Sequence, residues 1–150
     1  MSVKVVCQNK KAAHEYFITE RYEAGLVLTG SEVKSLRQGK ATLADGYAQV
    51  VGNEVLLYNV HISPYSHTHH EEQAPTRTRK VLFHRQEIRR LIGKIQEKGL
   101  TLIPTKIYFK NGWVKVELAL AKGKKLYDKR ESIKRREEER EIAKRYRGRN

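Results

Sequence analysis

The side chains that could act as nucleophiles or metal ligands lie in two places in this sequence. Cys7 and His14 make the first, a thiol with an imidazole able to act as its base. Both lie near the start of the chain, where fixed geometry is uncommon, so we expect an inert thiol. The second has the residue types of a zinc site and comprises His67, His69, His70 and Glu71. Because zinc ligands are held by rigid elements and these lie in a long polar loop, we expect no metal site.

Other catalytic signatures are absent from the sequence. It contains no glycine-rich phosphate loop, no Cys-x-x-Cys and no His-Glu-x-x-His. A nuclease would need several acids to hold metal ions, and Asp45 and Glu117 have no obvious partners. We therefore expect a protein that is not an enzyme and that needs no cofactor.

Charge is the most informative chemical feature of the chain. Its 150 residues include 31 Lys and Arg against 17 Asp and Glu, a formal net charge of +14 at pH 7. Such a one-sided excess attracts polyanions, nucleic acid first and anionic membrane second. No stretch approaches the roughly 18 apolar residues of a membrane span, so we expect no membrane partner. A single cysteine excludes an internal disulfide framework and favours a cytoplasmic location.

The elements that position this charge include a hairpin over residues 106–120. Asn111 and Gly112 are a strong signal for a type I′ turn, because both positions of that turn need a positive φ. After the turn, apolar residues at 114, 116, 118 and 120 alternate with other residues, which is the period of a half-buried strand. The sequence therefore predicts a strand that leads directly into the basic end of the chain.

The remaining pattern favours a mainly β fold. Further strands are predicted at residues 14–18, 23–28, 47–51, 54–62 and 101–110, with residues 1–13 mobile. Thr29 and Glu32 have capping-box spacing and open a short helix that ends at Gly39. A long helix is predicted over residues 84–98, with apolar residues at 88, 91, 92 and 95 on one face and Gly99 after it. About six antiparallel strands with one long and one short helix favour an OB-fold-like closed barrel, and a ferredoxin-like α+β sheet is the second choice.

The chain divides into a body of residues 1–121 and a basic tail of residues 122–150. The tail has 13 Lys and Arg against 6 acids and few apolar residues, so nothing offsets the entropy of ordering it alone. Pairs at i,i+4 spacing, including Glu131 with Arg135 and Glu141 with Arg145, nevertheless support a helix. We expect the tail to be disordered when free and helical on a polyanion.

These features together predict an RNA-binding protein. Of its aromatic residues, one or two are expected to stack on bases, and the candidates are Tyr22, Tyr47, Tyr58, Tyr108 and Trp113. The competing classes are a general single-strand RNA-binding or RNA-chaperone module, a structural ribosomal protein and a nuclease. A single-strand module would bind RNA according to its length and regardless of its structure.

Six segments resemble the bacterial SsrA-binding protein (small protein B) family, in the same order and at the same spacing. They are residues 9–12, 14–18, 22–30, 32–37, 76–80 and 121–130. The resemblance implies an OB-fold barrel that binds the transfer-RNA-like part of transfer-messenger RNA and is not an enzyme. It further implies two partners, elongation factor Tu and a ribosome stalled on a message without a stop codon. On that ribosome the tail is expected to occupy the decoding centre of the small subunit and the message channel.

The resemblance also implies functional residues. The RNA-binding set, which includes the basic residues of the matching segments, is Asn9, Lys10, Lys11, Glu23, Lys34, Arg79, Lys80, Leu82 and His84. The set in the ribosome-binding tail is Gly123, Lys124, Lys125, Tyr127, Asp128, Lys129 and Arg130. Two positions depart from the usual family residues, since position 84 is often Asn and position 127 is often His. His84 keeps a donor and an acceptor, while Tyr127 keeps a flat stacking face and loses the titratable ring.

Overall fold

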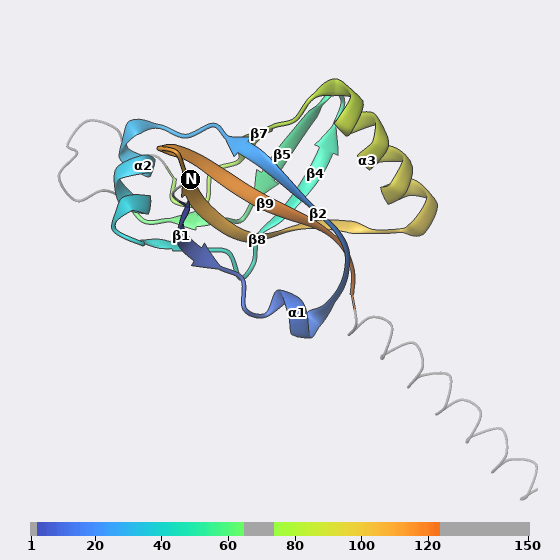
Figure 1. The fold of residues 1–150 in the computed structure, drawn as a ribbon, viewed down its shortest axis with the longest axis horizontal. Coiled ribbons are helices and arrows are strands. Elements are labelled where there is room, and N and C mark those ends of the chain that lie inside the picture. Colours follow the sequence, from blue (N-terminus) through green and yellow to red (C-terminus); the bar gives the residue numbers. More distant parts are fainter. Residues whose placement is uncertain (1–2, 65–73, 124–150) are drawn as a thin grey trace, which may run out of the picture.

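The computed structural model describes residues 3–64 and 74–123, and these form a β-rich body with helices around it (Figure 1). Its nine strands are β1 (Val3–Gln8), β2 (Tyr16–Leu26), β3 (Ala41–Thr42), β4 (Tyr47–Val51), β5 (Glu54–Tyr58), β6 (His61–Ile62), β7 (Arg79–Leu82), β8 (Thr101–Lys110) and β9 (Trp113–Gly123). Its three helices are α1 (Ala12–Glu15), α2 (Gly30–Arg37) and α3 (Arg85–Lys98). The prediction of a mainly β fold is confirmed.

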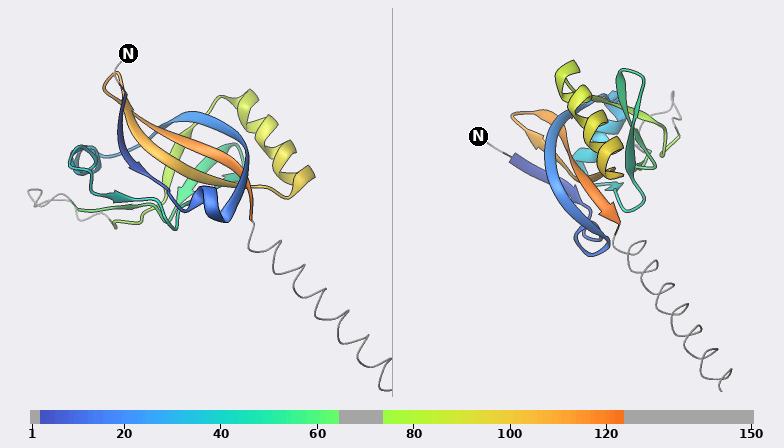
Figure 2. Two further views of the ribbon diagram at one scale, coloured as in Figure 1. Left: turned by 60° about the horizontal axis from the view of Figure 1, so that its bottom comes forward. Right: turned by 90° about the vertical axis from the view of Figure 1, so that its right-hand side faces the viewer.

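Seven of the strands make one antiparallel sheet in the order β1-β8-β4-β5-β7-β2-β9, and β3 pairs with β6 separately. An additional pairing joins β8 to β9. Each of the strands β8, β4, β5, β7, β2 and β9 therefore pairs with the next one in this order, and β9 pairs again with β8, which makes a cycle of strand pairings. Figure 2 shows β2 as a long curved strand beside β9, and nine residue pairs align these two strands.

The main apolar core unites the strands and two of the helices, and a smaller apolar cluster gathers Ala12 of α1 with Ile103, Ala119 and Ala121. The main core contains Leu57 and Leu118 from the sheet, Leu36 from α2 and Leu91 from α3, all at most 1% exposed. Along β9 the buried Val116 and Leu118 alternate with Lys115 and Glu117, which lie on the opposite side of the sheet, whereas residues 118–121 are all buried. The alternation therefore gives the sheet an apolar inner face and a charged outer face.

Several local predictions are confirmed by backbone geometry. Asn111 and Gly112 have φ values of 52° and 82°, as a type I′ turn requires. The hydroxyl of Thr29 accepts from the amide of Glu32 and the Glu32 carboxylate accepts from the amide of Thr29, which makes a complete capping box. Gly99 closes α3 in the left-handed conformation with φ 60°.

The prediction that residues 1–13 are mobile is wrong for the described part of that segment. β1 pairs with β8 from Val3 opposite Lys110 to Gln8 opposite Lys106. The backbone edge of β8 would otherwise lack partners along residues 106–110, and β1 supplies them. Few of the β1 side chains are buried, so no alternating pattern revealed the strand in the sequence.

Other predicted elements also differ from the structure. The two strands expected at residues 14–18 and 23–28 are one strand, β2, with a register shift between Ile18 and Glu20. The strand expected at residues 54–62 is divided by Asn59, whose φ is 58°, into β5 and β6. β9 continues past residue 121, and its last residue, Gly123, still pairs with Tyr16. The described residues hold nine strands rather than about six, and a third helix, α1.

None of the helices in the described part of the chain is long and apolar enough to cross a membrane.

Candidate nucleic-acid interface

The outer face of the sheet brings together residues from β2, β7, β8, β9 and β1. Strand register places Gly25 opposite both Leu82 and Lys115, Lys115 opposite Tyr108, and Tyr108 opposite Val5. Glu23 lies two residues before Gly25 on the same face of β2. We define the outer face by this row and its neighbours on the same strands, which include Glu23, Lys106, Lys110, Trp113 and Glu117.

A hydrogen-bonded cluster lies at the middle of the outer face. The Tyr108 hydroxyl donates to the Glu23 carboxylate, and Lys110 Nζ lies 3.2 Å from Glu23 Oε1. The bond from Tyr108 lowers the pKa of Glu23, and Lys110 adds to that effect. Burial, followed by the bond to Glu23, raises the pKa of Tyr108. Glu23 is therefore an ionised acceptor at neutral pH, suited to accept from N–H or hydroxyl groups of RNA rather than to act as a base.

Leu82 points to solvent on this face and is 53% exposed. It lies against Gly25, at which an added Cβ would be 3.3 Å from Leu82 Cδ1. Lys80, two residues earlier on β7, is also exposed and pairs with Glu54 at 3.2 Å. His84 is the exposed residue that precedes α3 and makes no side-chain cap bond. β7 therefore presents Lys80 and Leu82 outward and leads directly to His84.

Asn9 is half-buried at the end of β1. Its Nδ2 donates to the carbonyls of Pro104 at 3.2 Å and Leu43 at 3.4 Å. This clamp fixes the position from which the exposed Lys10 and Lys11 project before α1. Asn9 therefore has a structural task in this protein, and its amide nitrogen is already engaged.

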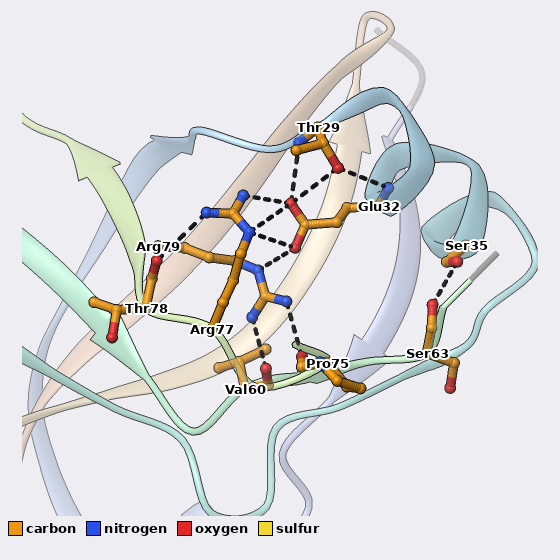
Figure 3. Close-up of polar contacts among 9 residues, drawn as sticks. All are labelled: Thr29, Glu32, Ser35, Val60, Ser63, Pro75, Arg77, Thr78 and Arg79. Carbon is orange, nitrogen blue, oxygen red and sulfur yellow. Dashed lines mark hydrogen bonds and ion pairs between the residues drawn. The ribbon is translucent and has the colours of Figure 1, made fainter. Parts of the chain in front are cut away.

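Arg79, expected in the RNA-binding set, is enclosed by the protein. Its side chain is 0% exposed and its Nε lies 2.6 Å from the carboxylate of Glu32 (Figure 3). Its two terminal nitrogens donate to the carbonyls of Val60 at 2.6 Å and Pro75 at 2.9 Å. All three nitrogens of the guanidinium have partners inside the protein, so the structure places Arg79 within the fold and not on the outer face. The alternation along β7, which turns Lys80 and Leu82 outward, turns Arg79 inward.

The Glu32 carboxylate also binds Arg77, whose side chain is 28% exposed (Figure 3). Burial by itself raises the pKa of Glu32, but Arg77, the Thr29 amide and Arg79 outweigh burial and hold that pKa below its ordinary value. This network joins the start of α2 to the segment that enters β7. Lys34, on the same helix, is exposed.

The expected tail residues are mostly outside the described part of the chain. Gly123 is the last described residue, and it pairs with Tyr16 at the end of β9. Lys124, Lys125, Tyr127, Asp128, Lys129 and Arg130 lie beyond it, as do the remaining tail residues. The first two residues of the predicted tail, Lys122 and Gly123, therefore belong to β9. His67, His69, His70 and Glu71 lie in residues 65–73, which are also outside the described part of the chain.

The described residues offer little for catalysis. Burial raises the pKa of Cys7 to about 11, so its thiol is protonated and a poor nucleophile at neutral pH. A groove of about 410 Å³ lies between α3 and β4, where Ile92 and Ile95 face Tyr47 and Leu102. No acid, histidine or cysteine is among the residues that line it.

Sequence reasoning missed the residues that hold Glu23 in place. Tyr108 and Lys110 belong to β8, and the alternating pattern of that strand predicts that they share a face. Their pairing with Glu23, 85 and 87 residues away, depends on how β2 and β9 are placed in the sheet. No signal in a single sequence gives that pairing.

Comparison with known proteins identifies a family. The family model described as SmpB protein matches residues 6–148 of the chain. A protein of Syntrophobacter fumaroxidans named SsrA-binding protein is 62% identical over 139 residues, which cover 93% of this chain and 86% of that protein. A second protein with this name, from Desulforudis audaxviator, is 61% identical over 145 residues, covering 97% of this chain and 95% of the relative.

A solved structure is also similar. It is described as "tmRNA-SmpB: a journey to the center of the bacterial ribosome" and has a TM-score of 0.67 at 48% sequence identity. The match covers 79% of this chain and 83% of the chain in that structure.

Proposed function

Because the chain belongs to the SmpB protein family, we propose that it binds transfer-messenger RNA and delivers it to stalled ribosomes in trans-translation. It is an RNA-binding protein of ribosome rescue and not an enzyme. The relatives are named for binding SsrA, and the similar structure is described as tmRNA with SmpB in the bacterial ribosome.

The observation that carries this proposal is the composition of the outer face. Glu23 and Leu82, two residues that the family resemblance implies for RNA binding, lie on adjacent strands of one face. Lys115 lies in register beside Gly25, and Lys110 lies 3.2 Å from Glu23. An ionised acceptor and an exposed apolar side chain therefore have lysines next to them, on a face that also carries Glu117 opposite Glu23. Acceptors and apolar groups read RNA features, and lysines bind phosphates. We propose that this face binds the transfer-RNA-like part of the RNA.

We further infer that the cycle of strand pairings is an OB-type closed barrel, and that the body and the basic tail act separately. The proposed boundary follows β9, so the body extends to Gly123 and the tail begins after it. Lys10, Lys11, Lys80 and His84 are proposed as further RNA contacts at the margin of the outer face. Arg79 is assigned to support the fold, and the exposed Lys34 on α2 stays a proposed RNA contact.

The tail is proposed to be helical on the ribosome and to enter the vacant decoding centre and message channel. Its charge supports this, since message and a basic tail would compete for one phosphate-lined path. We propose that elongation factor Tu joins through the RNA and that the protein acts in the cytoplasm, where ribosomes and tRNA-like substrates are found.

Binding is expected to follow RNA structure and to weaken steeply with salt. With about 5–8 phosphates neutralised, log K should fall by about 0.7–0.9 per phosphate for each log unit of salt. The measurement is a titration of the transfer-RNA-like domain at several salt concentrations, with an unstructured RNA of equal length as competitor. Equal affinity for the two RNAs at physiological salt would instead support a general single-strand RNA-binding module.

A further inference from the structure

The protein contains one tryptophan, Trp113, and the structure places it at the tip of the β8–β9 hairpin. Its side chain is 73% exposed. The turn itself requires only Asn111 and Gly112, which supply the two positive φ values. Nothing in the turn geometry therefore calls for a large aromatic residue at the next position.

The other aromatic candidates for base stacking are occupied within the protein. Tyr108 is 5% exposed and donates to Glu23. Tyr47 and Tyr58 stack on each other with ring centroids 5.2 Å apart. Tyr22 packs edge-on against Phe83 at 6.4 Å. Among these residues, only Trp113 presents most of its surface to solvent.

The surroundings of Trp113 have the composition of a nucleic-acid contact. Lys110 lies opposite it across the hairpin, and Lys115 follows on the same side of β9. Val3, which is 52% exposed, lies opposite Lys110 on β1. The hairpin tip lies beside the start of β1 and far from α3 in Figure 1 and in the left view of Figure 2.

The tip is continuous with the outer face. Lys110 makes the link, because the residue opposite Trp113 is also the lysine that lies 3.2 Å from the Glu23 carboxylate. A ring at this position, flanked by lysines, offers a flat apolar surface next to phosphate-binding groups. That combination suits an unpaired base with its backbone, since base–aromatic stacking tolerates any base and lysines neutralise the adjoining phosphates.

We propose that Trp113 stacks on an unpaired base of the transfer-messenger RNA bound to the outer face. This inference rests on the proposed function and adds to it a specific contact at the hairpin tip. The occupant is the RNA rather than the ribosome, because the tip continues the surface that carries Glu23 and Leu82.

The single tryptophan allows a direct test with the full-length protein. Titration with the isolated transfer-RNA-like domain should change Trp113 fluorescence with the same dissociation constant that a gel shift gives. Iodide should quench the bound protein less than the free protein. Trp113→Ala should weaken binding about 5- to 150-fold, the range for loss of one stacked base. Trp113→Phe should retain most of the affinity, and Trp113→Lys should not restore it despite the added charge.

Val51→Ala is the matched control, because Val51 is 49% exposed and also adjoins a two-residue hairpin turn. It should leave affinity unchanged, and all variants should unfold at the wild-type temperature. Wild-type affinity of Trp113→Ala in the gel shift, or unchanged tryptophan emission when the wild-type protein binds the RNA, would overturn the inference and leave the proposed function intact. A fluorescence change seen only after ribosomes are added would also overturn it. Failure of the wild type to shift the RNA would instead count against the proposed function.

Discussion

Replacing residues 127–130 together with alanine is expected to abolish peptide tagging on stalled ribosomes and to leave RNA binding nearly unchanged. Tyr127 is proposed to stack in the vacant decoding centre, while Lys129 and Arg130 bind phosphates and Asp128 orients its basic neighbours. The loss of one stacking contact and two charge-assisted contacts should reduce occupancy of the decoding centre by the tail by about two orders of magnitude. The two measurements are a reconstituted tagging assay and the affinity for isolated transfer-messenger RNA.

A charge-matched control separates recognition from simple attraction. The four residues carry a net charge of +1, so Arg147→Ala removes the same net charge further along the tail. We expect this variant to tag nearly as well as wild type. If the fourfold variant lost RNA affinity and tagging equally, the tail would be only an electrostatic anchor for the RNA, and its proposed role in the decoding centre would be wrong.

Replacing Glu32 with glutamine is expected to destabilise the body severely. Arg79 would then be left with its charge uncompensated at a position where its side chain is 0% exposed. Removal of one partner from a buried ion pair typically costs about 3–5 kcal/mol. For a domain of this size that corresponds to a fall of roughly 10–20 °C in melting temperature. Thermal unfolding followed by circular dichroism measures the change directly.

The exposed pair of Glu54 and Lys80 supplies the control for Glu32. Both side chains are about half exposed, at 52% and 49%, so Glu54→Gln should cost at most about 1 kcal/mol. If the Glu32 and Glu54 variants had similar melting temperatures, the buried network would not be a main support of the fold.

The same network should make stability depend on pH in the acid range. The pKa of Glu32 in the folded protein lies below its ordinary value of 4.5. Its contribution to stability is therefore complete above 4.5 and is lost as the pH falls through the folded pKa. The Glu32→Gln protein should lack this component of acid destabilisation.

Local features of the fold could be predicted because they depend on neighbouring residues. The capping box at Thr29 and Glu32 and the turn at Asn111 and Gly112 are set within four residues of chain. The long helix was also predictable, since its apolar stripe has a clear 3.6-residue period and Gly99 ends it.

Features that depend on distant pairing could not be predicted from the residues alone. β1 was missed because its side chains are mostly exposed and its stability comes from the backbone edge of β8. Arg79 was predicted on the RNA face because a buried arginine has no distinct local sequence pattern. Its burial is explained only by its ion pair with Glu32, 47 residues away. For the same reason Tyr108 and Lys110 were not associated with Glu23. The resemblance supplied Glu23 and Leu82, and the structure supplied the residues that hold and surround them.

The central claim is that this protein selects transfer-messenger RNA by its structure. The most direct measurement is to purify the full-length protein from bacterial cells at moderate salt and to sequence the RNA that remains bound. The account predicts that transfer-messenger RNA predominates far beyond its share of cellular RNA. A bound pool of diverse unstructured fragments, in proportion to their abundance, would contradict it.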